Sequence, residues 1–358
     1  MITVTAPHTG EILGEVPERT ADELDRAMER ARHAVTGWAG QGFEGRAVVM
    51  RRVRDALLGE KSRLIDVMCA ETGKVRADAV LEVTSTFDTL HYYLSQGARH
   101  LADEVVTPHL FKHKRGYVAF HPLGVVGIIS PWNFPLDLSF GEVVPALLAG
   151  NAVLLKPSEL TPLIALEVQR IAVGAGLDPG LFQVMTGAGE TGAALVERVD
   201  AVTFTGSAAV GRKVAATASR RLIPFTLELG GKDPMIVMRD ADLDRAASGA
   251  VWGAFFNCGQ MCMSVERVYV EEAVAEDFIG RVVQRTQALR QGPEHARNGD
   301  VGSMTRLAQI DVVERHVSDA RERGARILTG GDIVPGKTRA YYQPTVLTGV
   351  DHSMEIMR

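Results

Sequence analysis

Two short segments of the chain place a carboxylate and a thiol among glycines. Glu228 lies in the segment Leu-Glu-Leu-Gly-Gly-Lys, and Cys262 ends the segment Gly-Gln-Met-Cys. A thiol and a carboxylate base are the minimum parts for nucleophilic catalysis through a covalent thioester. A third segment, Pro-Trp-Asn-Phe-Pro, carries Asn133, whose side-chain amide is a suitable donor to an oxyanion. The three segments together indicate acyl chemistry on a cysteine.

The thiols are too few to form a disulfide framework. The chain has three cysteines, Cys69, Cys258 and Cys262, which fits a reducing compartment. Cys258 and Cys262 would share a face if they lay on one helix, as the two thiols of a metal or redox pair do. No clustered histidine or further cysteine accompanies them in the sequence, so we expect no metal site.

The middle of the chain alternates short apolar runs with helical stretches. Each run ends in glycine, proline or serine, a pattern typical of buried parallel strands followed by crossover helices. The runs lie at residues 124–129, 152–155, 182–185 and 201–204. Before them, apolar residues at helical spacing predict helices around residues 24–35 and 49–57. The pattern predicts an α/β fold with a doubly wound sheet.

Two further patterns flank this sheet. Residues 99–121 contain two short strands around the basic run 112–115, which predicts a hairpin with a solvated end rather than a nucleic-acid patch. A second set of strands is expected after Glu228. These strands lie at residues 235–238, 267–270, 325–328 and 342–346.

Composition limits the class of protein. Of the 358 residues, 46% are apolar and 23% are charged, which allows a sizeable core and predicts two domains. The net charge is −5 and the basic residues are dispersed, so we expect no nucleic-acid partner. No run approaches the roughly 18 apolar residues of a membrane span, and residues 1–5 lack the basic flank of a signal peptide. We therefore expect a cytoplasmic protein with no membrane partner.

The three segments, taken together, resemble the aldehyde dehydrogenase family. Singly, Asn133 is typical of a turn, Glu228 of a cap or surface ion, and Cys262 of a core position between two methionines. Their joint order and spacing fit the family, and other segments fit it from residue 6 to the end of the chain. These are residues 6–11, Trp38, residues 156–159, residues 204–207 and Arg267.

The resemblance implies a domain organisation. A Rossmann-type cofactor domain would occupy residues 1–227, and an α/β catalytic domain would occupy residues 228–358. Residues 99–121 would be the hairpin that joins subunits in a homodimer or homotetramer of the full-length protein. Gln260 and Arg267 would be scaffolding around the nucleophile.

The resemblance also implies the chemistry. Cys262, and not Cys258, would attack the aldehyde carbon, while the Asn133 amide and the Cys262 backbone N–H would bind the oxyanion. Glu228 would deprotonate the water that hydrolyses the thioester. Relatives that pass the acyl group to coenzyme A or phosphate commonly lack this glutamate. The expected reaction is therefore NAD-dependent oxidation of an aldehyde to a free carboxylic acid.

The expected cofactor contacts lie where strands end and helices begin, since open α/β sheets bind ligands there. By resemblance, Lys156 and Glu159 would contact the adenosine ribose, and Ser207 would lie near the pyrophosphate. A carboxylate beside the ribose 2′ position accepts a hydroxyl's hydrogen bond but repels a phosphate, so we expect NAD rather than NADP. The other expected cofactor contacts are Ile129, Ser130, Pro131, Trp132, Ser158, Gly189, Phe204, Gly206, Leu229 and Gly230.

One glycine motif has two interpretations. Residues 187–192 read Gly-Ala-Gly-Glu-Thr-Gly, a G-x-G-x-x-G between a strand and a helix. The dinucleotide fingerprint follows the first strand and has an acidic residue about 20 positions on, whereas this motif follows the third run and Asp200 comes too soon. A tight turn that packs the helix on the sheet explains the motif at least as well. The loop lines the cofactor cleft at most.

Two departures from the family bear on the substrate. Gly141 and Glu142 stand where many relatives carry a bulky aromatic residue and a lysine, which would widen the substrate tunnel and puts a proton relay there in doubt. Met261 and Met263 would form an adaptable apolar wall beside the nucleophile. We expect a medium or long apolar or aromatic aldehyde. Two alternatives stay open: a semialdehyde dehydrogenase, for example for succinate semialdehyde, and a catalytically impaired fragment that retains nucleotide binding or subunit association.

The last residues lead to a further expectation. Family members that resemble residues 350–358 continue into a Glu-x-Phe-Gly-Pro segment that binds the nicotinamide ribose, and this sequence does not contain it. We therefore expect a truncated chain or the product of an interrupted gene, which binds NAD weakly and turns over poorly.

Overall fold

The computed structural model describes residues 1–292 and 298–358, which form two compact units. The first unit comprises Met1–Ile2, Val16–Leu64 and Glu82–Glu228, and the second comprises Thr3–Glu15, Ile65–Leu81 and Leu229–Arg358. Hydrogen bonds show why residues 65–81 belong to the second unit. The Thr305 hydroxyl donates to the Thr72 carbonyl (2.6 Å), and the Ser303 N–H donates to the Gly73 carbonyl (3.0 Å). That the units are a cofactor domain and a catalytic domain stays a prediction.

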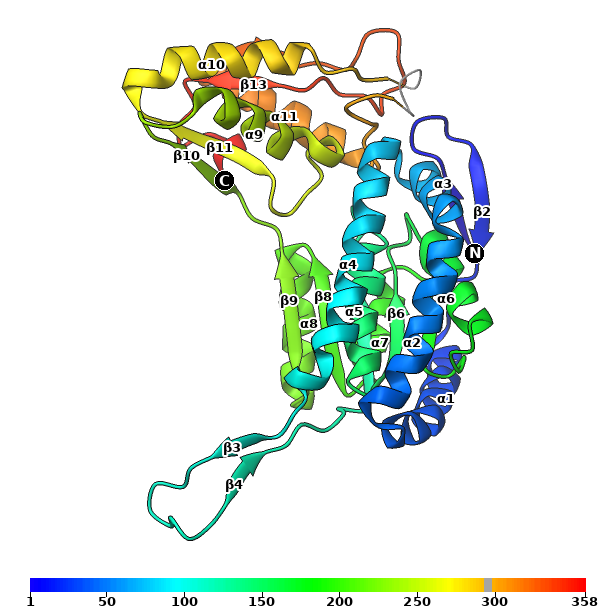
Figure 1. Ribbon diagram of the computed structural model, residues 1–358. Coiled ribbons are helices and arrows are strands. Elements are labelled where there is room, and N and C mark those ends of the chain that lie inside the picture. Colours follow the sequence, from blue (N-terminus) through cyan, green and yellow to red (C-terminus); the bar gives the residue numbers. More distant parts are fainter. Residues whose placement is uncertain (293–297) are drawn as a thin grey trace. The chain divides into compact units, whose positions relative to one another are not determined.

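The first unit contains a five-stranded sheet (Figure 1). Its strands are β5 (Val125–Ile129), β6 (Ala152–Lys156), β7 (Phe182–Val184), β8 (Ala201–Gly206) and β9 (Phe225–Leu229), in the order β7-β6-β5-β8-β9. β5 pairs in parallel with β6 and β8, and β6 pairs in parallel with β7. All residues of β5, β6 and β7 are buried, which explains their continuous apolar runs. The chain builds outward from β5 to β7 and then returns to add β8, so the strand order reverses between β5 and β8.

Helices cover both faces of this sheet, which confirms the predicted doubly wound α/β fold. One group contains α1 (Ala21–Gly40), α7 (Gly189–Val196) and α8 (Ala208–Arg221), and the other contains α5 (Asp137–Leu148) and α6 (Leu163–Gly174), with α2 (Gly42–Gly59) packed outside. α1 illustrates the sequence logic. Leu24, Ala27, Met28 and Ala31 form its buried stripe, and a capping box closes its first turn at Thr20.

A hairpin follows the long helix α4 (Arg76–His100) (Figure 1). Its strands β3 (Glu104–Val106) and β4 (Gly116–Val118) are antiparallel, with Val105 opposite Tyr117. The structure thus contains the hairpin expected at residues 99–121, although the strands are shorter than the sequence suggests. The basic run 112–115 is exposed in the connection between them.

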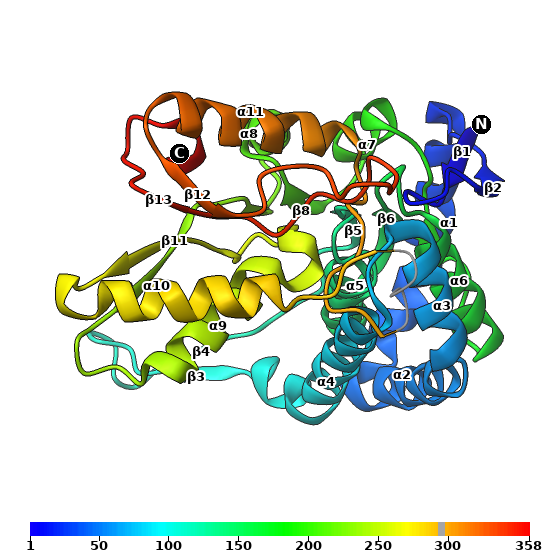
Figure 2. The ribbon, with the colours of Figure 1, turned by 90° about the horizontal axis from the view of Figure 1, so that it is seen from above.

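The second unit contains two further strand pairs and the helices α9 (Leu243–Phe255), α10 (Glu272–Gln287) and α11 (Ala308–Glu322) (Figure 2). β10 (Asp233–Val237) and β11 (Val265–Val270) are parallel, whereas β12 (Arg326–Thr329) and β13 (Val346–Thr348) are antiparallel. α9 packs on α10 and ends in the short 3-10 helix η1 (Phe256–Gly259). The strand expected at residues 342–346 begins only at Val346, because Pro344 has no N–H to donate to a ladder.

The remaining elements are short or lie outside the sheets described above. β1 (Ile2–Thr5) pairs with β2 (Ile12–Val16), α3 (Lys61–Thr72) precedes α4, and η3 (Glu355–Met357) packs on α11. None of the helices in residues 1–292 and 298–358 is long and apolar enough to cross a membrane.

Candidate functional site

The carboxyl edge of the five-stranded sheet brings together residues predicted to contact the cofactor. Ile129, the last residue of β5, pairs with Lys156 at the end of β6 and with Phe204 in β8. The Ser130 N–H continues this ladder by donating to the Lys156 carbonyl (3.1 Å). These residues stand where the strand order reverses, which is the usual ligand position in open α/β sheets.

The Lys156 side chain is buried although it carries an amine. Its Nζ donates to the carbonyls of Pro157 (2.8 Å) and Gly187 (3.0 Å), and it lies 3.8 Å from the Glu159 carboxylate. Burial lowers the pKa of Lys156 below its ordinary value, and the charge of Glu159 opposes that shift. The Glu159 side chain is 48% exposed, so the buried Lys156 amine lies beside a carboxylate that is open to solvent.

The glycine motif at residues 187–192 packs a helix onto this edge. α7 begins at Gly189, inside the motif. A Cβ on Gly192 would lie 3.3 Å from Lys156 Cδ and 3.7 Å from Ile129 Cδ1, so the glycine permits close contact between helix and sheet. The motif also supplies the Gly187 carbonyl that binds Lys156. This arrangement favours the tight-turn interpretation.

Two features of the same edge suit a dinucleotide. α7 follows β7 after a short loop and α8 follows β8 after Ser207, which caps α8 by accepting the Val210 N–H (3.4 Å). The N–H groups and dipole of a helix N-terminus attract phosphate. In addition, the Ser130 hydroxyl is buried and has no hydrogen-bond partner among the described residues. Buried polar groups are normally satisfied, so a bound ligand would complete this site.

Asn133 is half-buried in the loop between β5 and α5, and a remote residue anchors the end of that loop. The buried carboxylate of Glu82, on α4, accepts the N–H groups of Leu136 (2.8 Å) and Asp137 (3.2 Å). α5 has no side-chain cap of its own, so Glu82 serves as its cap and complements the helix dipole. The Asp137 carboxylate also accepts a hydrogen bond from Thr86 of α4 (3.1 Å).

Glu228 is an exposed residue of β9, and its charge acts on Glu142 of α5. Burial raises the pKa of Glu142 above its ordinary value, and the negative charges of Glu228 and Asp137 raise it further. The carboxyl group of Glu142 therefore holds its proton more tightly than a free glutamate does. An acidic environment thus surrounds the position where the family resemblance leads one to expect a lysine.

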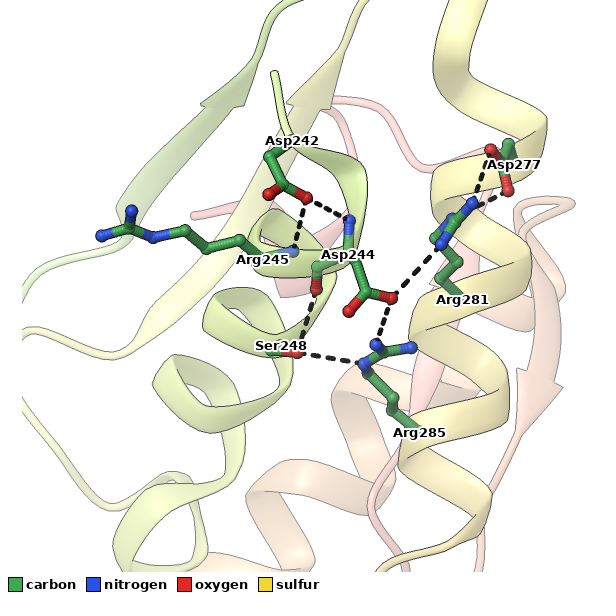
Figure 3. Close-up of polar contacts among 7 residues, drawn as sticks. All are labelled: Asp242, Asp244, Arg245, Ser248, Asp277, Arg281 and Arg285. Atoms are coloured by element: carbon green, nitrogen blue, oxygen red, sulfur yellow. Dashed lines mark hydrogen bonds and ion pairs between the residues drawn. The ribbon is translucent and has the colours of Figure 1, made fainter.

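In the second unit, α9 leads the chain toward Cys262, and α10 braces its N-terminal half (Figure 3). Asp242 caps α9 by accepting the N–H groups of Asp244 (3.1 Å) and Arg245 (3.2 Å). The Asp244 carboxylate accepts hydrogen bonds from Arg285 (2.6 Å) and Arg281 (3.3 Å) of α10. These ion pairs link α9 to α10, although exposed ion pairs contribute little to stability.

α9 ends in a turn with an unusual backbone, which we name the nucleophile turn. It consists of Asn257, Cys258 and Gly259, whose φ angles are 51°, 63° and 72°. A left-handed conformation costs a residue with a Cβ about 1–2 kcal/mol, so two such residues in succession require support from their surroundings. Cys262 follows at an exposed position.

Hydrogen bonds within the second unit supply this support. The buried Asp78 carboxylate accepts the Asn257 N–H (3.1 Å). The Gln260 side chain donates through Nε2 to the Asn257 carbonyl (3.1 Å) and accepts the Thr305 N–H through Oε1 (2.9 Å). The Thr305 hydroxyl in turn donates to the Thr72 carbonyl (2.6 Å). The nucleophile turn is therefore bound to two segments that are remote in the sequence.

The two cysteines of this segment have different surroundings. Burial raises the pKa of the Cys258 thiol to about 12, the Asp78 charge adds to the shift, and the Sγ donates to the Gly302 carbonyl (3.4 Å). The Cys262 side chain is exposed. A thiol with so high a pKa is a poor nucleophile at neutral pH, so the geometry favours Cys262.

The Gly-Gly-Lys segment lies beside Cys262 within the second unit. A Cβ on Gly231 would lie 3.9 Å from the Cys262 carbonyl oxygen. Arg267 of β11 fixes this segment by donating through Nε (3.0 Å) and Nη2 (2.6 Å) to the Lys232 carbonyl. The surroundings of Arg267 are thus those of a scaffold residue.

The predicted site residues fall into two sets. The catalytic candidates Asn133 and Glu228 belong to the first unit, together with the cofactor candidates up to Ser207, whereas Leu229, Gly230 and Cys262 belong to the second. Sequence reasoning missed Asp78 and Glu82, which support the two candidate catalytic loops. The available signal was an acidic pair one helical turn apart in an otherwise apolar stretch of sequence.

The chain is similar to known proteins along its whole length. The sequence profile described as Aldehyde dehydrogenase family matches residues 1–358. A Mycolicibacterium smegmatis protein named "putative succinate-semialdehyde dehydrogenase (NADP+)" is 43% identical over 351 residues, which make up 98% of this chain and 68% of that protein. Two solved structures are also similar. Succinate-semialdehyde dehydrogenase from Burkholderia pseudomallei has a TM-score of 0.95 at 35% identity, covering 99% of this chain and 73% of that one. Mycobacterium tuberculosis aldehyde dehydrogenase complexed with NAD+ has a TM-score of 0.94 at 33% identity, covering 100% of this chain and 74% of that one.

The match extends over the whole chain and includes the sheet edge and the cysteine-bearing turn described above. On this evidence the chain belongs to the aldehyde dehydrogenase family, enzymes that oxidise aldehydes with a nicotinamide cofactor.

Proposed function

We propose that the protein oxidises an aldehyde to its carboxylic acid with NAD, through a thioester on Cys262. The observation that carries the proposal is the contrast between two thiols. Cys262 is exposed three residues after a hydrogen-bonded turn, whereas burial raises the pKa of Cys258 in that turn to about 12. Asn133 and Glu228 are proposed as oxyanion donor and general base, on the strength of family resemblance.

In the proposed reaction, the Cys262 thiolate bonds through Sγ to the aldehyde carbon as the carbonyl π bond breaks, and the carbonyl oxygen becomes an oxyanion. The Asn133 side-chain amide and the Cys262 N–H donate to that oxygen, and one such donor is typically worth about 2.7–4 kcal/mol in the transition state. A bound nicotinamide would supply the hydride acceptor, and loss of hydride from the carbon would leave a thioester on Cys262. Glu228 then removes a proton from water as its oxygen attacks, and the C–S bond breaks to release the acid and the Cys262 thiolate.

The residues at the sheet edge fit the nicotinamide cofactor. Lys156 and Glu159 would hold the adenosine ribose, the N-terminus of α8 at Ser207 would receive phosphate, and the buried Ser130 hydroxyl would bond to the ligand. The exposed Glu159 carboxylate supports NAD over NADP, because it would repel a 2′-phosphate. The Mycolicibacterium relative is named for NADP+ and the Mycobacterium structure contains NAD+, so the preference requires a direct test.

The catalytic assignments are tested by following NADH formation with a panel of aldehydes. Cys262→Ala should abolish turnover, while Cys258→Ala should leave it largely intact. Glu228→Gln should slow turnover yet still release a first equivalent of NADH, since only deacylation needs the base. Equal activity of the two cysteine variants would defeat the nucleophile assignment, and full dependence on added coenzyme A would indicate acyl transfer instead of hydrolysis.

The cofactor preference is tested through kcat/KM for each nucleotide. The wild type should favour NAD, and Glu159→Gln should raise the ratio of NADP to NAD efficiency by about tenfold, equivalent to about 1.4 kcal/mol. Glu29→Gln, at an exposed position of α1 in the same unit, serves as the control. A wild type that prefers NADP, or a ratio that Glu159→Gln does not change, would refute the argument.

Two substrate classes are candidates. Met263 is 64% exposed next to the nucleophile, and this apolar surface supports a medium or long apolar or aromatic aldehyde. The names of the Mycolicibacterium and Burkholderia proteins favour a second candidate, succinate semialdehyde. A kcat/KM for hexanal or benzaldehyde that exceeds the value for succinate semialdehyde would support the first candidate, and the reverse order would support the second.

A cytoplasmic location is proposed on chemical grounds. Cys69, Cys258 and Cys262 are all free, and a catalytic thiol persists in a reducing compartment. Fractionation of cells that make the protein would test the proposed location. Recovery of the protein in the secreted fraction would contradict it.

A further inference from the structure

At the nucleophile turn, the backbone N–H that follows the last hydrogen bond of α9 donates to a side chain. The Phe256 N–H still donates to the Trp252 carbonyl, as the last bond of the helix. The next N–H, that of Asn257, belongs to a residue with φ of 51°, and it donates to the Asp78 carboxylate rather than back to the helix (3.1 Å). Helices that end in a left-handed residue usually satisfy this N–H with one of their own carbonyls. Here a side chain from α4 takes that role.

The acceptor Asp78 is far from Asn257 in the sequence, so the hydrogen bond between them is not part of α9 itself. Asp78 is buried in the first turn of α4, 179 residues from its partner in the sequence, and both residues belong to the second unit. The Asp78 charge also contributes to the raised pKa of Cys258, which places the carboxylate close to the turn as a whole. On the other side of the turn, Gln260 binds the Asn257 carbonyl. The N–H of Asn257 is thus bound by Asp78, and its carbonyl is bound by Gln260.

We propose that Asp78 is a positioning residue for the nucleophile. By accepting the Asn257 N–H, its carboxylate holds the nucleophile turn in the left-handed conformation, which sets where Cys262 and its backbone N–H lie. The inference rests on the proposed role of Cys262. It assigns Asp78 an effect on the rate of attack and of hydride loss rather than on cofactor binding, because misplacing a reacting atom by about 1 Å is enough to cost about 100-fold in rate.

A merely structural role for Asp78 makes a different prediction. A carboxylate in the first turn of a helix also stabilises that helix through its negative charge. If this were its whole contribution, the charge would matter and the precise position of the oxygen would not. Asp78→Glu keeps the charge but moves the oxygen by about one bond length, whereas Asp78→Asn removes the charge but keeps an acceptor oxygen in place. The two variants therefore separate the two roles.

The experiment measures three quantities in the full chain: kcat and KM for aldehyde and NAD, the rate at which iodoacetamide alkylates Cys262 without cofactor, and the melting temperature. Asp78→Ala should lower kcat by about 100-fold with KM for NAD nearly unchanged. Asp78→Asn should retain kcat within about threefold, and Asp78→Glu should lose at least about tenfold. The alkylation rate of Cys262 should depart from the wild-type rate in the same order.

Two controls complete the design. Phe278→Leu disturbs the core cluster around Val237 and Ala250 in the same unit, away from the turn, and should lower the melting temperature with kcat intact. Should Asp78→Ala fail to fold, the comparison of Asp78→Asn with Asp78→Glu still decides the question. Wild-type kcat in Asp78→Ala, or a defect in Asp78→Asn that Asp78→Glu does not share, would overturn the proposal. Turnover by Cys262→Ala would instead refute the proposed function, while the alkylation rates would still report on the turn.

Discussion

Residues of the same type have different surroundings in this chain, because some are buried and others are exposed. The pKa of Cys258 is raised to about 12 and that of Cys69 to about 11, both chiefly by burial, whereas Cys262 is exposed. The two glutamates show the same contrast, because Glu228 is exposed and Glu142 is enclosed. Residue type alone therefore indicates which chemistry is available, and the fold decides which copy of the residue can perform it.

The enclosure of Glu142 predicts a pH-dependent effect on stability. Burial, followed by the charges of Glu228 and Asp137, raises its pKa in the folded protein above the ordinary value of 4.5. The folded state then binds the proton more tightly than the unfolded state, so the free energy of unfolding falls as pH rises from the unfolded pKa to the folded pKa. Glu142→Gln lacks this penalty, so its melting temperature should exceed that of the wild type by an amount that grows as pH rises above 4.5 and levels off above the folded pKa.

The matched control for this prediction is Glu29→Gln, at an exposed position of α1 in the same unit. Its melting temperature should follow that of the wild type at every pH. A difference between Glu142→Gln and wild type that stays constant over this pH range would show that the carboxyl group is not enclosed in the way described.

At the scale of elements, the sequence predicted the strands that a pattern of buried residues is enough to define. The runs that became β5 to β8 were predictable because each is buried on both faces and ends in a turn residue. The start of β13 was wrong by several residues, because Pro344 interrupts an otherwise strand-like run. The left-handed conformation of Cys258 had no signal in the sequence, since a cysteine is not typical of that region. The acidic pair Asp78 and Glu82 was visible in the sequence, but the remote backbone groups that it binds were not.

The cap of α5 is the clearest case of remote support, and it predicts a loss of stability. Glu82 accepts two N–H groups at the start of α5 from a position 54 residues away from Leu136 in the sequence. Glu82→Ala leaves both groups without that acceptor in a buried place, so the free energy of unfolding should fall by about 2 kcal/mol in urea titration. Glu82→Gln keeps an acceptor oxygen and should recover about half of the loss.

The control for the cap is Asp88→Ala, at an exposed position of α4, which should change the free energy of unfolding by less than about 0.5 kcal/mol. If Glu82→Ala were no less stable than Asp88→Ala, the carboxylate would not be the cap of α5. A fall in kcat that Glu82→Gln restores would further indicate that the cap positions the loop carrying Asn133.

At the scale of the whole molecule, the chain does not divide into two consecutive domains. The second unit takes residues 3–15 and 65–81 from the N-terminal part of the sequence, and hydrogen bonds from Ser303 and Thr305 to the Gly73 and Thr72 carbonyls hold one of these segments. The boundary expected at residue 228 came from the family resemblance, and a linear reading of strands and helices does not reveal these exchanges, because the donors and acceptors are more than 200 residues apart. The candidate nucleophile therefore depends on N-terminal sequence for its support.

The hairpin of β3 and β4 predicts self-association. Val105 and Tyr117 face each other across the hairpin and are 86% and 66% exposed. An isolated two-stranded hairpin is marginal in water, and exposed apolar groups of this kind mark interaction surfaces, so a second copy of the chain should cover it.

In light-scattering chromatography the wild type should elute as a dimer or larger assembly. Val105→Lys with Tyr117→Glu replaces the apolar pair by an opposite-charge pair that keeps the hairpin, and it should shift the mass to that of a monomer. Val48→Lys, on an exposed part of α2, should leave the assembly unchanged. A monomeric wild type, or an assembly that survives the paired substitution, would remove the hairpin as the joining element.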